Sequence, residues 1–433
     1  MESSSSSSLS SWPWLPDPLL ELILSRLNPL SGDYFRFGAV CKDWYKIMKD
    51  HRNVIRSKTQ IPLLMIPSNK KVKSRRSFFD VTCSRRFDSL HALVPYNIKA
   101  CGSSHGWLIY LEKTMKIVLY NPFQSHSRKN RENIGVIKLP PVMSIPNAIP
   151  YEYSVSKVML FGNPSITQNY VVLAFYSATN SLALLKGSSS SAPKKWIYLK
   201  DIRNDLYKFY TDAIMYKGFI YAVAATRGII SIDPYNDLVV KEIFRWPSMY
   251  NIPTYLAESS KGDLFILRRI LDEDDNSLFP TTFSFEVFRL KMEENPSMEE
   301  VDSLNGDTIF VGDGSSICIA ACDFDNCQPN SIYFSDDGFF PIITYPEDYH
   351  CGPRDTGIFN LEDRSIKPLY PYDLSHKYLP PAIWVNVEYI APLLPLLLLL
   401  YSPSALSSCQ AFVSTLELSR SFCPHQHCLI LLE

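Results

Sequence analysis

The feature that most constrains the fold is a series of short apolar segments that recurs along residues 91–385. These segments are rich in Val, Ile, Tyr and Phe and are bounded by turn-forming residues, which is typical of β-strands. Gly106, Gly218 and Gly262 each stand at the start of such a segment. Spacings of about 45 to 70 residues, with roughly four strands in each, are typical of the blades of a β-propeller. The sequence therefore predicts a mainly β fold, with a degenerate β-propeller over residues 91–385.

A pair of β-sandwiches is the alternative architecture, because the repeat is irregular. A propeller differs from a sandwich in closing on itself as a ring. Whether residues near 100 pair with residues near 358 to close a ring would settle the number of blades.

A second pattern, of helical period, occupies residues 12–52 and follows a serine-rich tail, residues 1–11, that is expected to be disordered. Asp17 is expected to cap a helix whose first residue is Pro18, where the missing N–H has no helical partner to lose. Apolar residues at helical spacing then form one broad stripe. A second helical stretch follows Gly32. The sequence predicts a small α unit of three helices, too short to hold much core by itself.

Residues 53–90 are predicted to be a basic linker with the first strands of the β region. The basic run "KKVKSRR" at residues 70–76 has two interpretations. It is either a solvated linker or a nuclear-import signal. We therefore expect the protein in the nucleus, the cytoplasm or both.

The composition is typical of a folded protein from a reducing compartment. Hydrophobic residues make up 46% of the 433 residues, and the formal net charge of −1 gives no global attraction to nucleic acid or to an anionic membrane. The ten cysteines are too irregular for a disulfide scaffold, and the amino-terminal segment lacks the order of a signal peptide. Residues 386–433 are leucine-rich but interrupted by prolines, so we expect a poorly ordered tail there, with a membrane anchor as the alternative.

No catalytic, metal or cofactor site is predicted. Ser104 and His105 lie in "GSSHG", which matches a nucleophile motif, but a strand follows where the motif requires a helix, so a tight turn is expected. "VGDGSS" from Val311 lacks the Lys and the helix of a phosphate-binding loop, so a hairpin is expected. The cysteines near residue 320 lack metal-ligand spacing, and "CPHQHC" near residue 425 crowds its donors too closely for a tetrahedral zinc site.

The helical unit resembles an F-box. The F-box pattern places Leu-Pro, leucines and an isoleucine on the first helix, then Asp, Arg and Phe, then Val-Cys-x-x-Trp. The matching residues are Leu15, Pro16, Leu19, Leu20, Ile23, Leu27, Val40, Cys41 and Trp44, together with Asp33, Arg36 and Phe37. The resemblance implies that the first nine of these residues bind the Skp-type adaptor of cullin-based ubiquitin ligases.

The β region resembles the plant F-box proteins that carry a kelch-like, propeller-type carboxy-terminal domain. "GSSHGWLIY" from Gly102, "YLAESSKGDLFILRR" from Tyr255 and "PPAIWV" from Pro380 carry this resemblance. It implies a non-enzymatic substrate-recognition subunit, which binds the adaptor and, through it, a cullin, and which holds a target protein on its β domain. The competing class is a propeller enzyme or a carbohydrate-binding module with an incidental helical cap. The two classes differ in whether the stripe Leu19–Leu27 is buried against the β domain or partly exposed.

Overall fold

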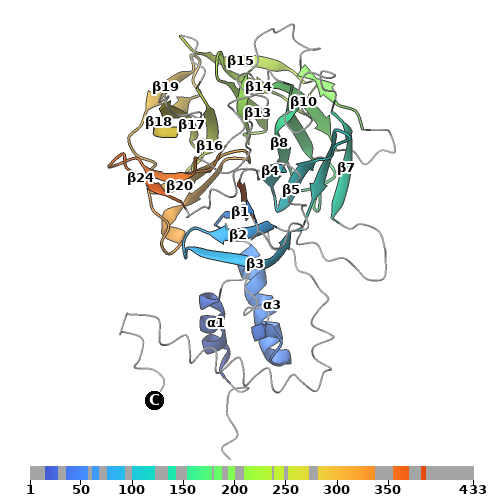
Figure 1. Ribbon diagram of the computed structural model, residues 1–433, viewed down its shortest axis with the longest axis vertical. Helices are drawn as coiled ribbons and strands as arrows, with labels where there is room; N and C mark the ends of the chain where they lie inside the picture. The colour runs from blue at the N-terminus through green and yellow to red at the C-terminus, as the bar shows by residue number, and fades with distance from the viewer. Residues whose placement is uncertain are drawn as a thin grey trace, which may run out of the picture. The chain divides into compact units, whose positions relative to one another are not determined.

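A computed structural model describes most of the chain: residues 15–27, 36–56, 61–67, 76–92, 100–121, 135–142, 154–177, 180–187, 194–199, 209–236, 238–247, 252–272, 281–336, 355–369 and 382–386. The chain divides into two compact units, Met1–Thr59 with Ala391–Glu433, and Gln60–Ile390. The described part of the first is helical and that of the second is β-sheet (Figure 1). They are called the helical unit and the β domain below. The predicted serine-rich tail and residues 387–433 of the predicted leucine-rich tail lie outside the described residues.

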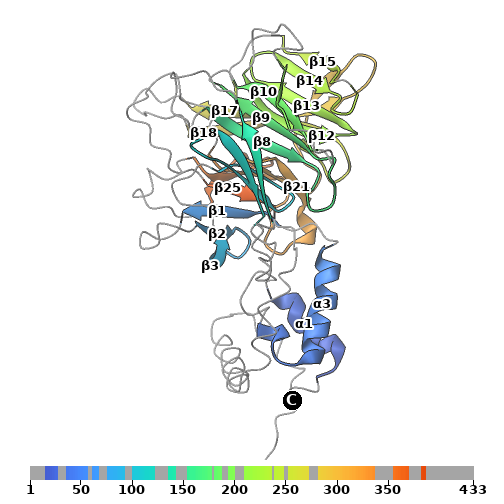
Figure 2. The same cartoon turned by 90° about the vertical axis from the view of Figure 1, so that its right-hand side faces the viewer.

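The helical unit contains α1 (Asp17–Arg26) and α3 (Lys42–Arg56), which pack side by side (Figure 2). The prediction that Asp17 caps the first helix is wrong. Pro16 is the N-cap, and its carbonyl accepts hydrogen bonds from the amides of Leu19 and Leu20 at 2.9 and 3.2 Å. The helix starts one residue early because Pro18 fits any position of the first turn, where amides have no helical partner.

The second predicted helical stretch is interrupted. Residues 36–38 are helical, the chain then turns, and α3 begins at Lys42. The amides of Ala39 and Val40 bond back to carbonyls three residues earlier, at 3.0 and 3.2 Å, which ends the preceding helical turn. The break places Phe37 and Trp44 on two separate elements that face each other.

The β domain contains six sheets in its described part, arranged around a common centre (Figure 1), so it is a six-bladed β-propeller rather than a pair of sandwiches. The first four blades are antiparallel and run in chain order from the innermost strand outward. The first blade consists of β4 (Ala100–Ser104), β5 (Trp107–Leu111), β6 (Lys116–Tyr120) and β7 (Val136–Pro141), and the second of β8 (Val155–Phe161), β9 (Val171–Tyr176), β10 (Ser181–Lys186) and β11 (Ile197–Tyr198). The third blade consists of β12 (Tyr210–Tyr216), β13 (Phe219–Ala224), β14 (Gly228–Ile232) and β15 (Val240–Arg245), and the fourth of β16 (Thr254–Glu258), β17 (Leu264–Asp272), β18 (Thr281–Lys291) and β19 (Ser297–Glu300).

The fifth blade has an extra strand. Its spatial order is β21, β20, β22, β23 and β24, and β20 runs parallel to β22 but antiparallel to β21. The strand bounds are β20 (Asp307–Val311), β21 (Ile317–Ala320), β22 (Ser331–Phe334), β23 (Gly357–Asn360) and β24 (Ile366–Pro368), with a short 3-10 helix at Ala321–Asp323. The strand β20 is therefore inserted between the innermost strand of this blade and the rest. The predicted hairpin at "VGDGSS" is confirmed, because this segment joins the paired strands β20 and β21.

The sixth blade closes the ring with both ends of the domain. β25 (Ile383–Val385) pairs with β1 (Leu63–Pro67), followed by β2 (Arg76–Asp80) and β3 (Arg85–Ala92), with Leu64 opposite Trp384. Residues near 100 and 358 do not pair to close the ring, since Ala100 lies on β4 of the first blade and Ile358 lies inside the fifth blade. The prediction that residues 53–90 are a basic linker with the first strands and that the propeller spans residues 91–385 needs correction, because β1 to β3 belong to the sixth blade of the propeller.

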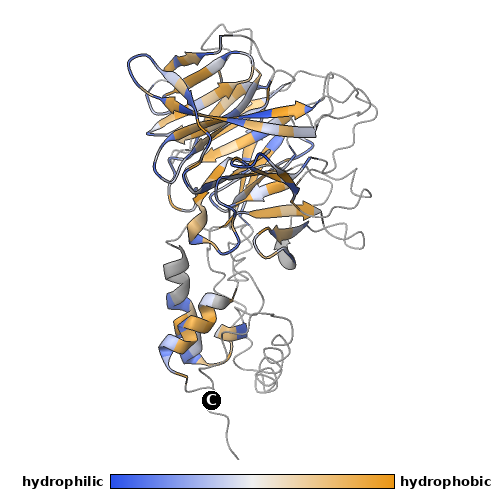
Figure 3. Ribbon diagram, turned by 90° about the vertical axis from the view of Figure 1, so that its left-hand side faces the viewer, coloured by the Kyte–Doolittle hydropathy of each residue, from blue (hydrophilic) through white to orange (hydrophobic). Residues whose placement is uncertain are grey.

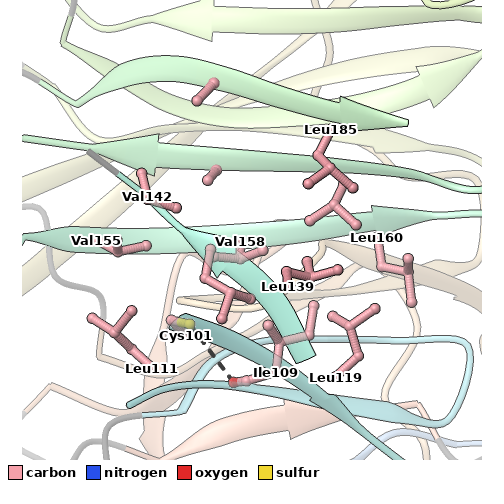
Figure 4. Close-up of a cluster of buried hydrophobic side chains, with 14 of the residues drawn as sticks. Cys101, Ile109, Leu111, Leu119, Leu139, Val142, Val155, Val158, Leu160 and Leu185 are labelled. Carbon is pink, nitrogen blue, oxygen red and sulfur yellow. Dashed lines mark hydrogen bonds between the residues drawn. The ribbon is translucent and has the colours of Figure 1, made fainter. Parts of the chain in front are cut away.

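The core lies between neighbouring blades. Strands are hydrophobic along much of their length (Figure 3), because a blade is covered on both faces. In β9, Val172, Ala174 and Tyr176 join the cluster towards the first blade, whereas Leu173 and Phe175 join the cluster towards the third. Figure 4 shows the first of these clusters, with Ile109, Leu119 and Val158 among its labelled members. No helix in the described part has the length and hydropathy of a membrane-spanning segment.

Candidate functional site

The helical unit has a small core of its own. Six side chains are buried: Leu20, Leu24, Phe37, Trp44, Ile47 and Met48. The rings of Phe37 and Trp44 lie 4.4 Å apart between centroids, with an angle of 33° between their planes. This stacking joins the turn before α3 to α3 itself. Leu20 and Leu24 fix α1 against both of them.

A different set of α1 leucines is open to solvent. Leu19 and Leu22 are 45% and 55% exposed, and Pro16 is exposed at the start of the same helix. Leu19 and Leu22 are three residues apart and so lie on one face, one turn from each other. An exposed pair of large apolar side chains on the face of a helix is typical of a protein-binding surface. Pro16, Leu19 and Leu22 are called the exposed stripe below.

The nine residues that the F-box resemblance singles out fall into three groups. Leu20 and Trp44 are buried in the core, so they hold the unit together and offer no accessible surface to a partner. Pro16 and Leu19 are exposed. The remaining five are half-buried: they pack against the core, and part of each side chain faces solvent. These are Leu15, Ile23, Leu27, Val40 and Cys41. A partner could therefore reach seven of the nine. Sequence reasoning missed Leu22, although its position three residues after Leu19 is the signal that could have found it.

The "GSSHG" segment has the geometry of a turn. Ser104 ends β4 and pairs with Trp107 at the start of β5, and no helix follows. His105 and Gly106 have φ of 51° and 73°, two successive positive values that are typical of a two-residue hairpin turn. The prediction of a tight turn is confirmed. The geometry of a nucleophile elbow, with its helix after the serine, is not present at Ser104.

The cysteines near residue 320 are ordinary buried or surface thiols. Burial, together with the charge and hydrogen bond of Asp307, raises the pKa of the Cys318 thiol, and burial also raises the pKa of Cys327. A raised pKa lowers the thiolate fraction and hence the reactivity. Within the described ranges, no group of His, Cys, Asp and Glu side chains has the arrangement of a metal site.

Buried charges near the centre of the β domain are paired within the protein. Lys157 of β8 contacts Asp212 of β12 at 2.7 Å, and Arg269 of β17 contacts Asp355 at 2.8 Å. The two oxygens of Asp212 already accept three hydrogen bonds, and the guanidinium of Arg269 has several acceptors. A catalytic carboxylate needs a free oxygen at a surface that substrate can reach. Asp212 does not have that geometry, because both of its oxygens are hydrogen-bonded and its side chain is fully buried. Asp355 is 18% exposed, and its Oδ2 accepts from Arg269 and from the amide and hydroxyl of Thr282.

Comparisons with known proteins assign both units. The F-box domain profile matches residues 12–56, and the profile of the KIB1-4 β-propeller matches residues 78–360. An Arabidopsis thaliana protein, At5g55150, is 24% identical over 372 residues, which cover 83% of this chain and 93% of that protein. The F-box protein At2g26160 of Arabidopsis thaliana is 24% identical over 349 residues, which cover 75% and 95%.

Solved structures are more distant. The dihydro-heme d1 dehydrogenase NirN matches with a TM-score of 0.32 and 9% identity over 77% of this chain and 78% of that one. A likeness at this level says nothing about function.

Proposed function

This chain belongs to the KIB1-4 β-propeller family and carries an F-box domain at residues 12–56, and from that premise we propose that it is the substrate-recognition subunit of a Skp-cullin-F-box ubiquitin ligase. In this proposal the helical unit binds a Skp-type adaptor and, through it, a cullin. The β domain holds a target protein. The match of residues 12–56 to the F-box domain supports the contact with the adaptor. The similarity of this chain to an F-box protein over 95% of that protein's length supports the combination of the two units in one chain.

The observation that carries the proposal is the exposed stripe on α1. Leu20 and Leu24 of α1 are buried in the core of the helical unit, whereas Leu19 and Leu22 of the same helix are exposed to solvent. Burying one leucine completely stabilises a complex by roughly 1.5–3 kcal/mol, so two such anchors with the half-buried residues around them offset a large part of the cost of association.

The proposed mechanism involves no covalent chemistry in this chain. A ubiquitin-conjugating enzyme recruited by the cullin would meet the lysines of a bound target at high effective concentration, because both are held in one assembly. The protein would thus act by placing two molecules together. We also propose a location in the nucleus or the cytoplasm, where such ligases assemble.

The competing reading, a propeller enzyme or carbohydrate-binding module, predicts that the stripe Leu19–Leu27 is covered by the β domain. Leu19 and Leu22 take no part in the core of the helical unit itself, so their apolar surface is available to a partner. A variant at Leu20 would not separate the two interpretations, because Leu20 is buried in the core and a charge there would unfold the helical unit.

Affinity purification of the full chain with the proteasome blocked tests the proposal. The wild type should retain a Skp-type adaptor and a cullin, and Leu19→Asp with Leu22→Asp should lose both, because two charges replace apolar contacts. Lys46→Asp is the matched control, since Lys46 is exposed on α3 rather than on the stripe and its replacement changes the net charge by the same amount as the double variant. The proposal fails if the double variant retains the adaptor as well as the control does.

A further inference from the structure

A buried ion pair lies at the centre of the β domain. Lys157, on the innermost strand of the second blade, contacts Asp212, on the innermost strand of the third, at 2.7 Å between Nζ and Oδ1. The side chains are 6% and 0% exposed. A pair so completely removed from water is costly to form unless further hydrogen bonds satisfy both partners.

The further bonds of Lys157 cross the ring. Its Nζ also donates to the carbonyl oxygen of Gly312 at 3.0 Å. Gly312 lies in the turn between β20 and β21 of the fifth blade. In a ring of six blades, the second and the fifth stand opposite each other. A direct hydrogen bond between opposite blades leaves no open passage between them at that level.

The bonds of Asp212 reach the next two blades of the ring. Its Oδ2 accepts from the backbone amide of Leu256, in the fourth blade, at 2.9 Å and from Oγ of Ser316, in the fifth blade, at 2.8 Å. Together, Lys157 and Asp212 join the second, third, fourth and fifth blades. Lys157 and Asp212 are each the third residue of an innermost strand, and the turn that contains Gly312 and Ser316 directly precedes the innermost strand β21, so these contacts lie towards the end of the central channel where the innermost strands begin.

A second buried pair extends this network outward. Tyr255 lies with its ring 5.6 Å from the Lys157 nitrogen, and its hydroxyl accepts a hydrogen bond from Arg269 at 3.1 Å. Arg269 in turn pairs with Asp355 at 2.8 Å and donates to Oγ1 of Thr282 at 2.7 Å. The charges near the channel are therefore tied to the fourth and fifth blades as well as to each other.

The turn between β20 and β21 fits closely into this position. Gly312 has a φ of 157°, and a Cβ there would overlap Oγ of Ser335. A Cβ on Gly314 would come within 3.3 Å of the carbonyl oxygen of Trp384 in the sixth blade. The absence of a side chain at Gly312 and Gly314 allows the turn to approach Ser335 and Trp384 this closely. The turn lies near the centre of the ring because it joins the inserted strand β20 to the innermost strand β21.

We propose that the β20–β21 turn, residues 312–316, is a plug that closes one end of the central channel and is locked there by Lys157 and Asp212. The plug makes this propeller a closed platform, so molecules held by the β domain are held on its outer surfaces and loops rather than in the channel. This inference rests on the contacts of the β domain and does not depend on the ligase role.

Lys157→Met tests the lock, because it leaves Asp212 as an unpaired buried charge. We expect the melting temperature of the full chain to fall by about 5–10 °C. Lys138→Met is the matched control, since it removes a lysine from a solvent-exposed pair with Glu112 and should shift the melting temperature by about 1 °C or less. Lys157→Met with Asp212→Asn should recover at least half of the loss, because the neutral amide oxygen of Asn can still accept the Leu256 amide.

Hydrogen exchange at Leu256 tests the closure itself. The Leu256 amide donates to Asp212 and faces the channel, so it should be protected in the wild type and exchange at least about tenfold faster in Lys157→Met. Leu267, on the neighbouring strand, is the internal reference. The plug is excluded if the Leu256 amide exchanges as fast as in an unfolded peptide in the wild type, or if Lys157→Met melts together with Lys138→Met. If Lys157→Met does not fold, hydrogen exchange of the Leu256 amide is measured instead in the variant that combines Lys157→Met with Asp212→Asn. An unprotected Leu256 amide in that variant overturns the proposal.

Discussion

Leucines of one helix serve different purposes according to their direction around the helix axis, which changes by about 100° from one residue to the next. On α1, Leu20 and Leu24 point into the core of the helical unit, while Leu19 and Leu22 point to solvent. The apolar face of α1 is wider than its contact with α3, so part of that face, with Leu19 and Leu22, remains for a partner to cover. The sequence pattern revealed the apolar face but could not divide it, because the division depends on where Phe37 and Trp44 lie. The resemblance to an F-box implied that Leu20 and Trp44 bind the adaptor, whereas both side chains are buried in the core of the helical unit.

Paired alanine substitutions test this division. Leu24→Ala should destabilise the helical unit by about 2–5 kcal/mol, since it leaves a cavity in a small core. Leu22→Ala should change stability by less than about 0.5 kcal/mol, since the side chain is more than half exposed. Hydrogen exchange of the amides of residues 42–48 in the full chain measures both. Equal protection in the two variants would contradict the division.

A cysteine in the β domain offers a test at the level of one atom. Burial and the neighbouring Asp80 raise the pKa of the Cys83 thiol to about 11, although the residue is exposed by surface area. The thiolate is the reactive form, so a raised pKa keeps Cys83 mostly protonated at neutral pH. Its rate of modification by a disulfide reagent should rise about tenfold for each pH unit from pH 7 to 9.5. A plateau near pH 9, as for a free thiol, would contradict this assignment.

Strands and tight turns are the elements that the sequence predicted well. Alternating apolar residues marked the strands, and Gly106, Gly218 and Gly262, each with a φ between 73° and 85°, marked the turns between the first two strands of three blades. The insertion of β20 was not predicted, because a strand pattern does not reveal which neighbour the strand will choose. β1 to β3 were placed in a linker partly because of the basic run, yet Arg76 is buried in β2.

Close contact between neighbouring blades gives a prediction for one glycine. A Cβ on Gly102 of β4 would overlap the carbonyl oxygen of Val158 on β8. Gly102→Ala should therefore destabilise the β domain by about 1–3 kcal/mol, because a backbone group cannot move aside as a side chain can. Ser103→Ala in the same strand should be neutral or stabilising, since its buried hydroxyl has no hydrogen-bond partner in the described part of the chain. Urea denaturation of the two variants would show whether they differ in sign.

The β domain depends as a whole on the meeting of its two ends. The innermost strand of the sixth blade, β25, is separated from β1 by the other five blades in the sequence, and no local pattern specifies that pairing. Trp384 secures it: the side chain is buried, its Nε1 donates to the carbonyl oxygen of Val311 at 3.0 Å, and its ring lies 4.9 Å from that of Phe310. The repeat of strands thus predicted a propeller, and only the structure showed how it closes.

Truncation tests this closure. A chain that stops after residue 381 lacks β25, so β1 has no inner neighbour and the cluster around Phe310 loses Trp384. We expect its melting temperature to fall by more than about 10 °C, or its unfolding to lose cooperativity. A chain that stops after residue 386 keeps every described strand and should melt like the full chain. Similar melting of the two truncated chains would contradict closure by β25.

The claim that this chain joins an adaptor to a target depends most on the exposed stripe, and a binding titration of the purified full chain with a Skp-type adaptor tests it most directly. The account predicts a dissociation constant of about 1 μM or tighter for the wild type. It predicts that Leu19→Ala with Leu22→Ala weakens binding by about tenfold or more while hydrogen exchange of α3 is unchanged. Equal affinity of the wild type and the double variant, or no binding by the wild type, would contradict it.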